Sequence, residues 1–159
     1  MHGKRVLVTG ANSGIGFATA EDLARRGADL VMVCRHVERG EAALAKLRKA
    51  VPAATVRLMQ CDLASMDSIR AFAEAYRNEE KAIDVLINNA GVYATKAEKT
   101  ADGIELMMGT NHVGTFLLTN LLLPKLQEAG GARIVVVASL AHKFQGLRLE
   151  QDWSTRWSG

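Results

Sequence analysis

Residues 5–16, Arg-Val-Leu-Val-Thr-Gly-Ala-Asn-Ser-Gly-Ile-Gly, decide the fold of this sequence, because an apolar run leads directly into a glycine-rich turn. Residues 5–9 are typical of a strand that is buried on both faces of a sheet. Gly10 permits a tight turn, Gly14 lets the backbone approach a pyrophosphate, and Gly16 lets a helix pack closely on the strand. The free amide groups and the dipole at a helix N-terminus favour an anion. The stretch therefore predicts a strand–turn–helix unit that binds a dinucleotide, with a ligand-free glycine turn as the alternative.

Short apolar segments alternate with longer amphipathic ones outward from this unit. The pattern predicts strands at 5–9, 30–34, 55–61, 83–87 and 134–138, and helices at 14–26, 41–50, 65–77 and 103–126, the last opened by Asp102. Such alternation is typical of a parallel sheet with helices on both faces. We therefore predict an α/β fold, a Rossmann-type doubly wound parallel sheet of about five strands. One domain is expected over residues 1–145, followed by an irregular tail at 146–159 that holds Trp153 and Trp157.

The composition excludes several classes of function. Hydrophobic residues make up 48% of the chain and charged residues 23%, as in an ordinary soluble domain. The net charge of +3 is spread along the helical stretches, so no nucleic-acid patch is expected. No segment approaches the ~20 apolar residues of a membrane span, and no signal peptide is recognised. Cys34 and Cys61 lie in strand-like runs without a histidine cluster, which predicts buried thiols, no metal site and a cytoplasmic location.

The residue after the second predicted strand indicates which dinucleotide is bound. A carboxylate about 20 residues beyond the glycines would bind a ribose 2′-hydroxyl and select NAD. Arg35 stands there instead, and residues 33–37 contain no acid. A guanidinium forms charge-assisted hydrogen bonds with a 2′-phosphate. We therefore expect NADP(H) rather than NAD(H), the alternative being that Arg35 is only a solvated surface side chain.

Three further segments complete a recognisable pattern. Asn88-Asn89-Ala90-Gly91 follows the fourth predicted strand, Asn111 lies in an Asn-His-Val-Gly sequence of the long helix, and Ser139 ends the fifth strand. With the spacing Gly-x-x-x-Gly-x-Gly at the turn, this sequence resembles the short-chain dehydrogenase/reductases. The detailed sequence of its motifs is most similar to the retinol-dehydrogenase-like branch of that family. The resemblance extends from about Lys4 to Lys143.

This resemblance implies a cofactor site and half of a catalytic set. Asp62 is expected to meet the adenine, Ser139 to orient the substrate carbonyl or alcohol, and Asn111 to support a proton-relay water. The residues that the resemblance assigns to cofactor binding are Gly10, Asn12, Ser13, Gly14, Ile15, Gly16, Arg35, Asp62, Leu63, Asn89, Ala90 and Gly91.

The family's catalytic Tyr-x-x-x-Lys has no counterpart in the sequence. The two tyrosines are Tyr76, expected in a surface helix, and Tyr93, and neither begins such a motif. The family's last helices and strands are also missing, so we interpret the chain as C-terminally truncated. Residues 134–137 would then form an open sheet edge, and a flank of the 103–126 helix with Leu117, Leu121 and Leu122 would lose its cover. Self-association through this edge and helix, or a homo-oligomer, is therefore expected.

Three interpretations of function stay open at this point. The first is an NADP(H)-dependent oxidoreductase acting on a small-molecule alcohol or carbonyl, with retinoid-like and other lipophilic compounds as candidates. The second is a catalytically silent module that binds nucleotide or pairs with other subunits. The third is a nonfunctional product of truncation.

Overall fold

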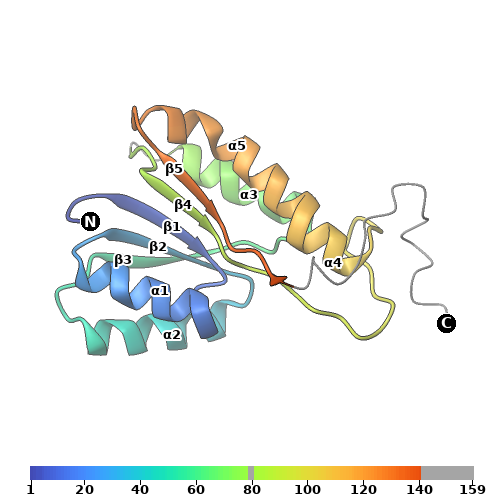
Figure 1. Cartoon of the computed structure of the whole chain (residues 1–159), viewed down its shortest axis with the longest axis horizontal. Helices are drawn as coiled ribbons and strands as arrows, with labels where there is room; N and C mark the ends of the chain where they lie inside the picture. Colours follow the sequence, from blue (N-terminus) through green and yellow to red (C-terminus); the bar gives the residue numbers. More distant parts are fainter. Residues whose placement is uncertain (79–80, 141–159) are drawn as a thin grey trace.

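Five parallel strands form one sheet, in the order β3-β2-β1-β4-β5, in the computed structural model of the chain (Figure 1). The structure describes residues 1–78 and 81–140. The strands are β1 (Arg5–Thr9), β2 (Asp29–Cys34), β3 (Val56–Gln60), β4 (Val85–Asn88) and β5 (Arg133–Val136). The helices are α1 (Gly14–Arg25), α2 (Val37–Ala50), α3 (Met66–Arg77), the single turn α4 (Leu106–Met108), the π-helix η1 (Gly109–Gly114) and α5 (Thr115–Gln127). The predicted Rossmann-type α/β fold is confirmed, while the predicted tail at 146–159 lies outside the described residues.

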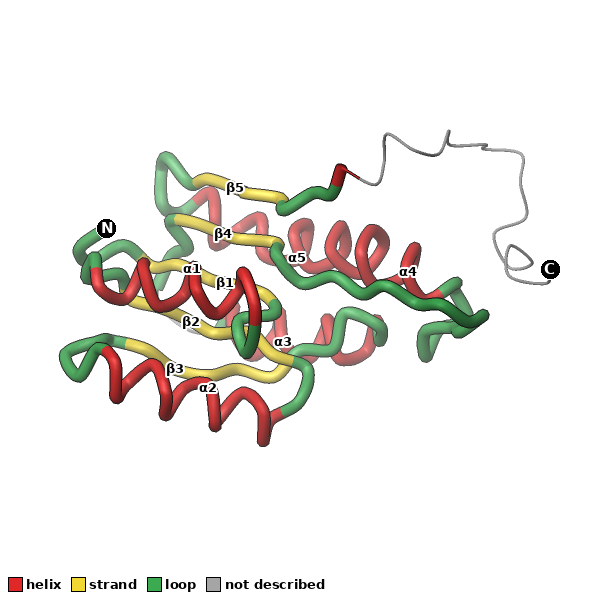
Figure 2. The backbone as a smooth tube through the Cα atoms, turned by 60° about the horizontal axis from the view of Figure 1, so that its bottom comes forward, coloured by secondary structure: helices red, strands yellow, loops and turns green. Residues whose placement is uncertain are grey.

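Two helical layers cover the sheet, with α1 and α2 on one face and α3 and α5 on the other (Figure 2). Side chains alternate along β1: Val6 and Val8 pack beneath α1 and α2, whereas Leu7 packs beneath α3 and α5. Successive strand residues point to opposite faces, so an unbroken apolar run fills both cores. This arrangement explains why the sequence of β1 carries no polar alternation.

Element boundaries differ from the predictions at α2, β4 and β5. Helix α2 begins at Val37, four residues before the predicted start, and its first turns include the buried Gly40, which packs against the Leu58 side chain of β3. Strand β4 begins at Val85 instead of residue 83, and the buried Ile83 instead donates its amide to Lys125 at the end of α5. Strand β5 covers Arg133–Val136 instead of 134–138.

The predicted helix over 103–126 is confirmed as an unbroken helical stretch, but it begins at Leu106, ends at Gln127 and contains a π-helical segment. The residues before it form a turn in which the Thr100 hydroxyl accepts hydrogen bonds from the amides of Asp102 and Ile104. Glu105 then caps the single turn α4 by accepting from the amides of Met107 and Met108. The chain continues as η1 and only then becomes the regular helix α5.

Tyr76 lies on the core side of the surface helix α3, and the prediction that a flank of α5 loses its cover was wrong. Tyr76 is fully buried and stacks on Phe72, with ring centroids 6.2 Å apart, so α3 turns its aromatic side chains into the core. Leu122 is fully buried, and Leu117 and Leu121 pack against the same core, because this flank of α5 faces the sheet and α3. The apolar side chains that α5 exposes are Phe116 and Leu123.

The predicted exposure of the last strand is confirmed for the described residues. Ile134, Val135, Val136 and Val137 are all exposed, Val136 by 63%. Strand β5 pairs with β4 on one side, and no strand among residues 1–78 and 81–140 pairs with its other side.

Candidate functional site

A cavity of about 390 Å³ lies at the carboxyl ends of the strands. The chain winds from β1 through β2 to β3 on one side and continues to β4 and β5 on the other, so the winding direction reverses between β1 and β4. In open parallel sheets such a switch point leaves a crevice where ligands bind. Four strand ends contribute to the lining, which consists of Thr9, Gly10, Asn12, Ser13, Ile15, Gly16, Val33, Arg35, His36, Arg39, Cys61, Asp62, Leu63, Asn89, Ala90, Gly91, Val92 and Thr110.

The glycine-rich turn is fixed to the segment after β4. The Thr9 hydroxyl accepts hydrogen bonds from the amides of Asn89 and Ala90, each at 3.0 Å, and the Asn89 side-chain amide donates to the Thr9 carbonyl at 2.9 Å. A side chain at Gly16 would collide with the Gly10 carbonyl and with Asn89. The first turn of α1 therefore sits directly on the β1–β4 junction, as the sequence predicted for Gly16.

The N-terminus of α1 is open toward solvent in the way that an anion site requires. Gly14 has φ +53°, a left-handed conformation that favours glycine, and no atom lies within 4 Å of the place where a Cβ would stand. The N-cap Ser13 makes no side-chain cap hydrogen bond, and the first turn holds no acidic residue. Its free amides can therefore receive a phosphate group. These features fit the pyrophosphate of a dinucleotide.

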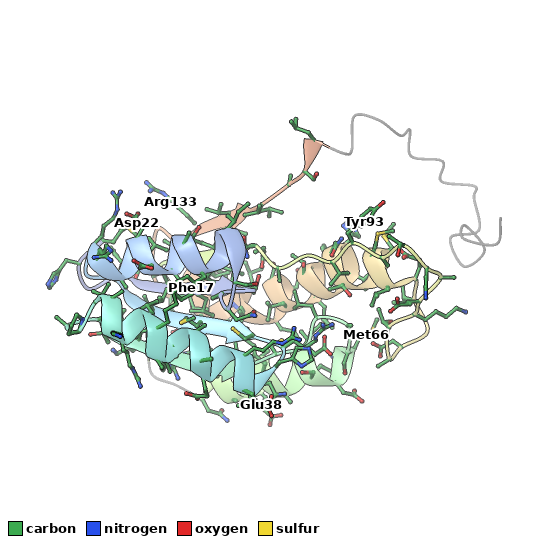
Figure 3. All side chains as sticks on the ribbon, turned by 90° about the horizontal axis from the view of Figure 1, so that it is seen from below. Phe17, Asp22, Glu38, Met66, Tyr93 and Arg133 are labelled. Atoms are coloured by element: carbon green, nitrogen blue, oxygen red, sulfur yellow. The ribbon has the colours of Figure 1, made fainter. Side chains whose placement is uncertain are left out.

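Three basic side chains gather on the wall of the cavity beyond β2. Arg35 ends the β2 segment, and its Nε donates to Nε2 of His36 at 3.2 Å. Arg39 lies in the first turn of α2, and its guanidinium group makes no hydrogen bond or ion pair with another described residue. In Figure 3 the neighbouring Glu38 lies at the right-hand end of α2, which is the end of this helix nearer to Met66 at the start of α3.

The segment after β3 closes the cavity on its third side. Asp62 accepts a hydrogen bond from the amide of Ala64 through Oδ1 at 2.9 Å, and its own amide donates to the Ser68 hydroxyl at 2.9 Å. Its neighbour Cys61 is buried; burial and the adjacent Asp62 carboxylate raise the pKa of this thiol to about 12. Burial likewise raises the pKa of Cys34 to about 11, so both cysteines are unreactive thiols near neutral pH.

Asn111 and Ser139 do not line the cavity. Asn111 lies in η1, where its Oδ1 accepts from the Val92 amide at 2.7 Å and its Nδ2 donates to the Val92 carbonyl at 2.9 Å. This pair of bonds holds the loop after β4 against the π-helix. Ser139 follows β5 and is exposed. The predicted roles of these two residues toward a substrate therefore stay predictions.

The cavity brings together eleven of the twelve residues predicted for the cofactor, since Gly14 alone is absent from the lining and lies just outside it. The prediction did not include the other seven lining residues, which are His36, Arg39, Thr110, Thr9, Val33, Cys61 and Val92. The sequence Arg-His-Val-Glu-Arg over residues 35–39 already contains His36 and Arg39. Because α2 was predicted to begin at residue 41, Arg39 was placed in a loop and not on the first turn of a helix beside the cavity. No helix among residues 1–78 and 81–140 is long and apolar enough to cross a bilayer.

Comparisons with known proteins agree with this geometry. A family model described as short chain dehydrogenase matches residues 4–150. Retinol dehydrogenase 11 of Homo sapiens is 51% identical over 140 residues, which cover 88% of this chain and 44% of that protein. The chain spans about half the length of the curated relatives that it matches.

Solved structures share the fold as well. An uncharacterized protein from Mycobacterium paratuberculosis is 41% identical, with a TM-score of 0.80 over 98% of this chain and 53% of its own. The F189W form of actinorhodin polyketide ketoreductase, solved with NADPH, is 32% identical, with a TM-score of 0.76 over 92% of this chain and 58% of its own. The strand order, the glycine turn and the family match lead to one conclusion: the chain belongs to the short-chain dehydrogenase family.

Proposed function

We propose that this chain forms the cofactor-binding part of an NADP(H)-dependent oxidoreductase that interconverts alcohols and carbonyl compounds. The observation that carries the proposal is the cavity at the β1–β4 switch point, which joins an open helix N-terminus to a basic wall. When bound, the nicotinamide cofactor supplies or accepts the hydride. The residues of this chain bind and orient it.

The proposed preference for NADP(H) is supported by the positive charges of Arg35 and Arg39 on the wall that they form with His36. A 2′-phosphate placed there would receive charge-assisted hydrogen bonds from guanidinium groups, which are stronger than neutral ones. The residues of this wall include no carboxylate to hold a 2′-hydroxyl; the acid that lines the cavity is Asp62, which follows the neighbouring strand β3. The ketoreductase solved with NADPH gives further support from a relative.

The first experiment compares two cofactors and three proteins. We expect the 159-residue chain to bind NADPH more tightly than NADH in a fluorescence titration. Arg35→Asp should weaken NADPH binding by about tenfold to a hundredfold, the equivalent of a lost hydrogen bond between charged groups, and should not weaken NADH binding, because a carboxylate there can accept from a ribose 2′-hydroxyl. Arg70→Asp, an exposed position on α3 that does not line the cavity, makes the same change of charge and serves as the control. Equal affinities of the parent chain for NADPH and NADH would overturn the assignment.

The substrate is proposed by chemical class. Relatives named retinol dehydrogenases favour a lipophilic alcohol or aldehyde, and retinol and retinal are the first compounds to assay. Ser139 and Asn111 are proposed to orient the substrate oxygen and a proton-relay water. The sequence contains no Tyr-x-x-x-Lys, so proton transfer is assigned to no residue of this chain.

NADPH binding without turnover would support a silent nucleotide-binding module instead. Self-association and a cytoplasmic location stay proposals based on the sequence.

A further inference from the structure

His36 occupies a particular position on the basic wall. It lies between Arg35 and Arg39 in the sequence, lines the same cavity and directly precedes the 14-residue helix α2. Its Nε2 accepts a hydrogen bond from Nε of Arg35 at 3.2 Å. His36 is also exposed and caps no amide of α2 through its side chain. The ring is therefore free to turn toward an anion in the cavity.

The charged groups that face His36 come from the ends of β2 and β3 and from α2. Arg35 approaches from the end of β2 and Arg39 from α2, and both are permanently positive. Asp62 follows the neighbouring strand β3 and accepts a hydrogen bond from the amide of Ala64. Glu38 lies on the first turn of α2 but does not line the cavity. Two fixed cations therefore dominate the surroundings of the imidazole.

A 2′-phosphate reverses this balance, because it brings up to two negative charges to the same wall. A nearby negative charge favours the charged form of an imidazole, and nearby positive charges disfavour it. The amides in the first turn of α2 and the two guanidinium groups would hold the phosphate within reach of the ring. Binding of the phosphorylated cofactor and protonation of His36 should therefore support each other.

We propose that His36 is a specificity-determining residue that takes up a proton when the 2′-phosphate of NADP(H) binds. The inference rests on the proposed preference for NADP(H). As a consequence, discrimination between NADP(H) and NAD(H) increases as the pH falls from 8.5 toward 6.5. Linkage fixes the sign: a group that binds its proton more tightly in the complex strengthens binding below that range and loses the effect as the pH rises through it.

The test uses 2′,5′-ADP and 5′-AMP as probes, since they differ only in the 2′-phosphate. Both are titrated into the 159-residue chain by calorimetry at pH 6.5, 7.5 and 8.5, in two buffers of different ionisation enthalpy. We expect the affinity ratio of the two probes to fall by about threefold to tenfold across this range, with net proton uptake at pH 7.5 for 2′,5′-ADP only. The phosphate's own second pKa of about 6 acts mainly below this window.

The decisive variant is His36→Gln, which keeps a neutral acceptor for Arg35 but cannot take up a proton. It should lose the proton uptake and flatten the pH dependence of the ratio, whereas His2→Gln, outside the cavity, should behave as the parent chain does. An unchanged pH dependence in His36→Gln overturns the inference and leaves the NADP(H) preference intact. A parent chain that binds 2′,5′-ADP no more tightly than 5′-AMP at any pH overturns both the role of His36 and the NADP(H) preference. A chain that binds neither probe does the same.

Discussion

Asp84 shows how one side chain can tie two strands together. Its Oδ1 accepts from Lys4 Nζ at 2.8 Å and its Oδ2 from the Arg5 amide at 2.8 Å, at the amino end of the sheet and away from the cofactor cavity. Burial alone would raise the pKa of this carboxyl, but the hydrogen bonds from Lys4 and Arg5 and the charge of Lys4 outweigh burial and lower the pKa. A carboxyl with a lowered pKa stabilises the fold at neutral pH and loses this effect as the pH falls through its folded-state value.

We therefore expect Asp84→Asn to lower the free energy of unfolding by about 1 kcal/mol at pH 7, because Lys4 is largely exposed and screened by solvent. The difference from the parent chain should shrink as the pH falls below about 4, where an unfolded aspartate is protonated. Urea unfolding at several pH values measures both effects. Asp22→Asn removes an exposed ion pair with Arg26 and should cost less than half as much. A pH-independent difference for Asp84→Asn would contradict the assignment.

At the scale of the element, η1 is the part of the chain that joins the cavity to α5. Asn111 makes both of its bonds to the backbone of Val92, and a side chain at Gly114 would collide with the Leu63 carbonyl, so the π-helix packs against loops from β3 and β4. We expect Asn111→Ala to lower the free energy of unfolding by about 1–2 kcal/mol, because two hydrogen bonds are lost and the loop is released.

Asn120→Ala is the matched control for this prediction. Asn120 lies on α5 and donates one exposed hydrogen bond to the Phe116 carbonyl of its own helix. Its loss should change the free energy of unfolding by no more than about 0.5 kcal/mol. Hydrogen exchange of the Val92 amide adds a local readout, and it should accelerate in Asn111→Ala only. Equal effects of the two substitutions would show that Asn111 holds no loop.

At this scale the sequence predicts those elements that are determined by residues close to one another along the chain. The strand, the glycine turn and α1 follow from residues 5–16 alone, and α3 was predicted to begin after Ser65, whose hydroxyl accepts from the Ser68 amide. The late start of this helix and its π-helical segment were not predictable from an apolar period that runs on without interruption. They depend on the turn at Thr100 and on the close packing of Gly114 against the Leu63 carbonyl. Likewise, Arg39 could be assigned to the basic wall only once α2 was seen to begin at Val37.

The whole molecule combines a well-packed core with an apolar margin. Both faces of the central strands are buried, yet β5 exposes all of Ile134–Val137 and has no strand partner on its outer side among the described residues. An exposed apolar edge of this kind offers unpaired backbone groups to another chain. The structure thus provides a physical basis for the self-association expected from the sequence.

We expect the 159-residue chain to self-associate at micromolar concentrations, and Val136→Lys to suppress this association, because a charge on an edge strand opposes pairing. Val136 is 63% exposed, so its replacement should alter the free energy of unfolding by less than about 0.5 kcal/mol. Ala45→Lys, at an exposed position on α2, adds the same charge away from the edge and should leave association unchanged. Sedimentation velocity over a range of concentrations compares the three proteins. If Ala45→Lys suppresses association as strongly as Val136→Lys, net charge and not the β5 edge controls the behaviour of the chain. If the parent chain is monomeric at all concentrations, the exposed edge at residues 134–137 does not cause self-association and the prediction is wrong.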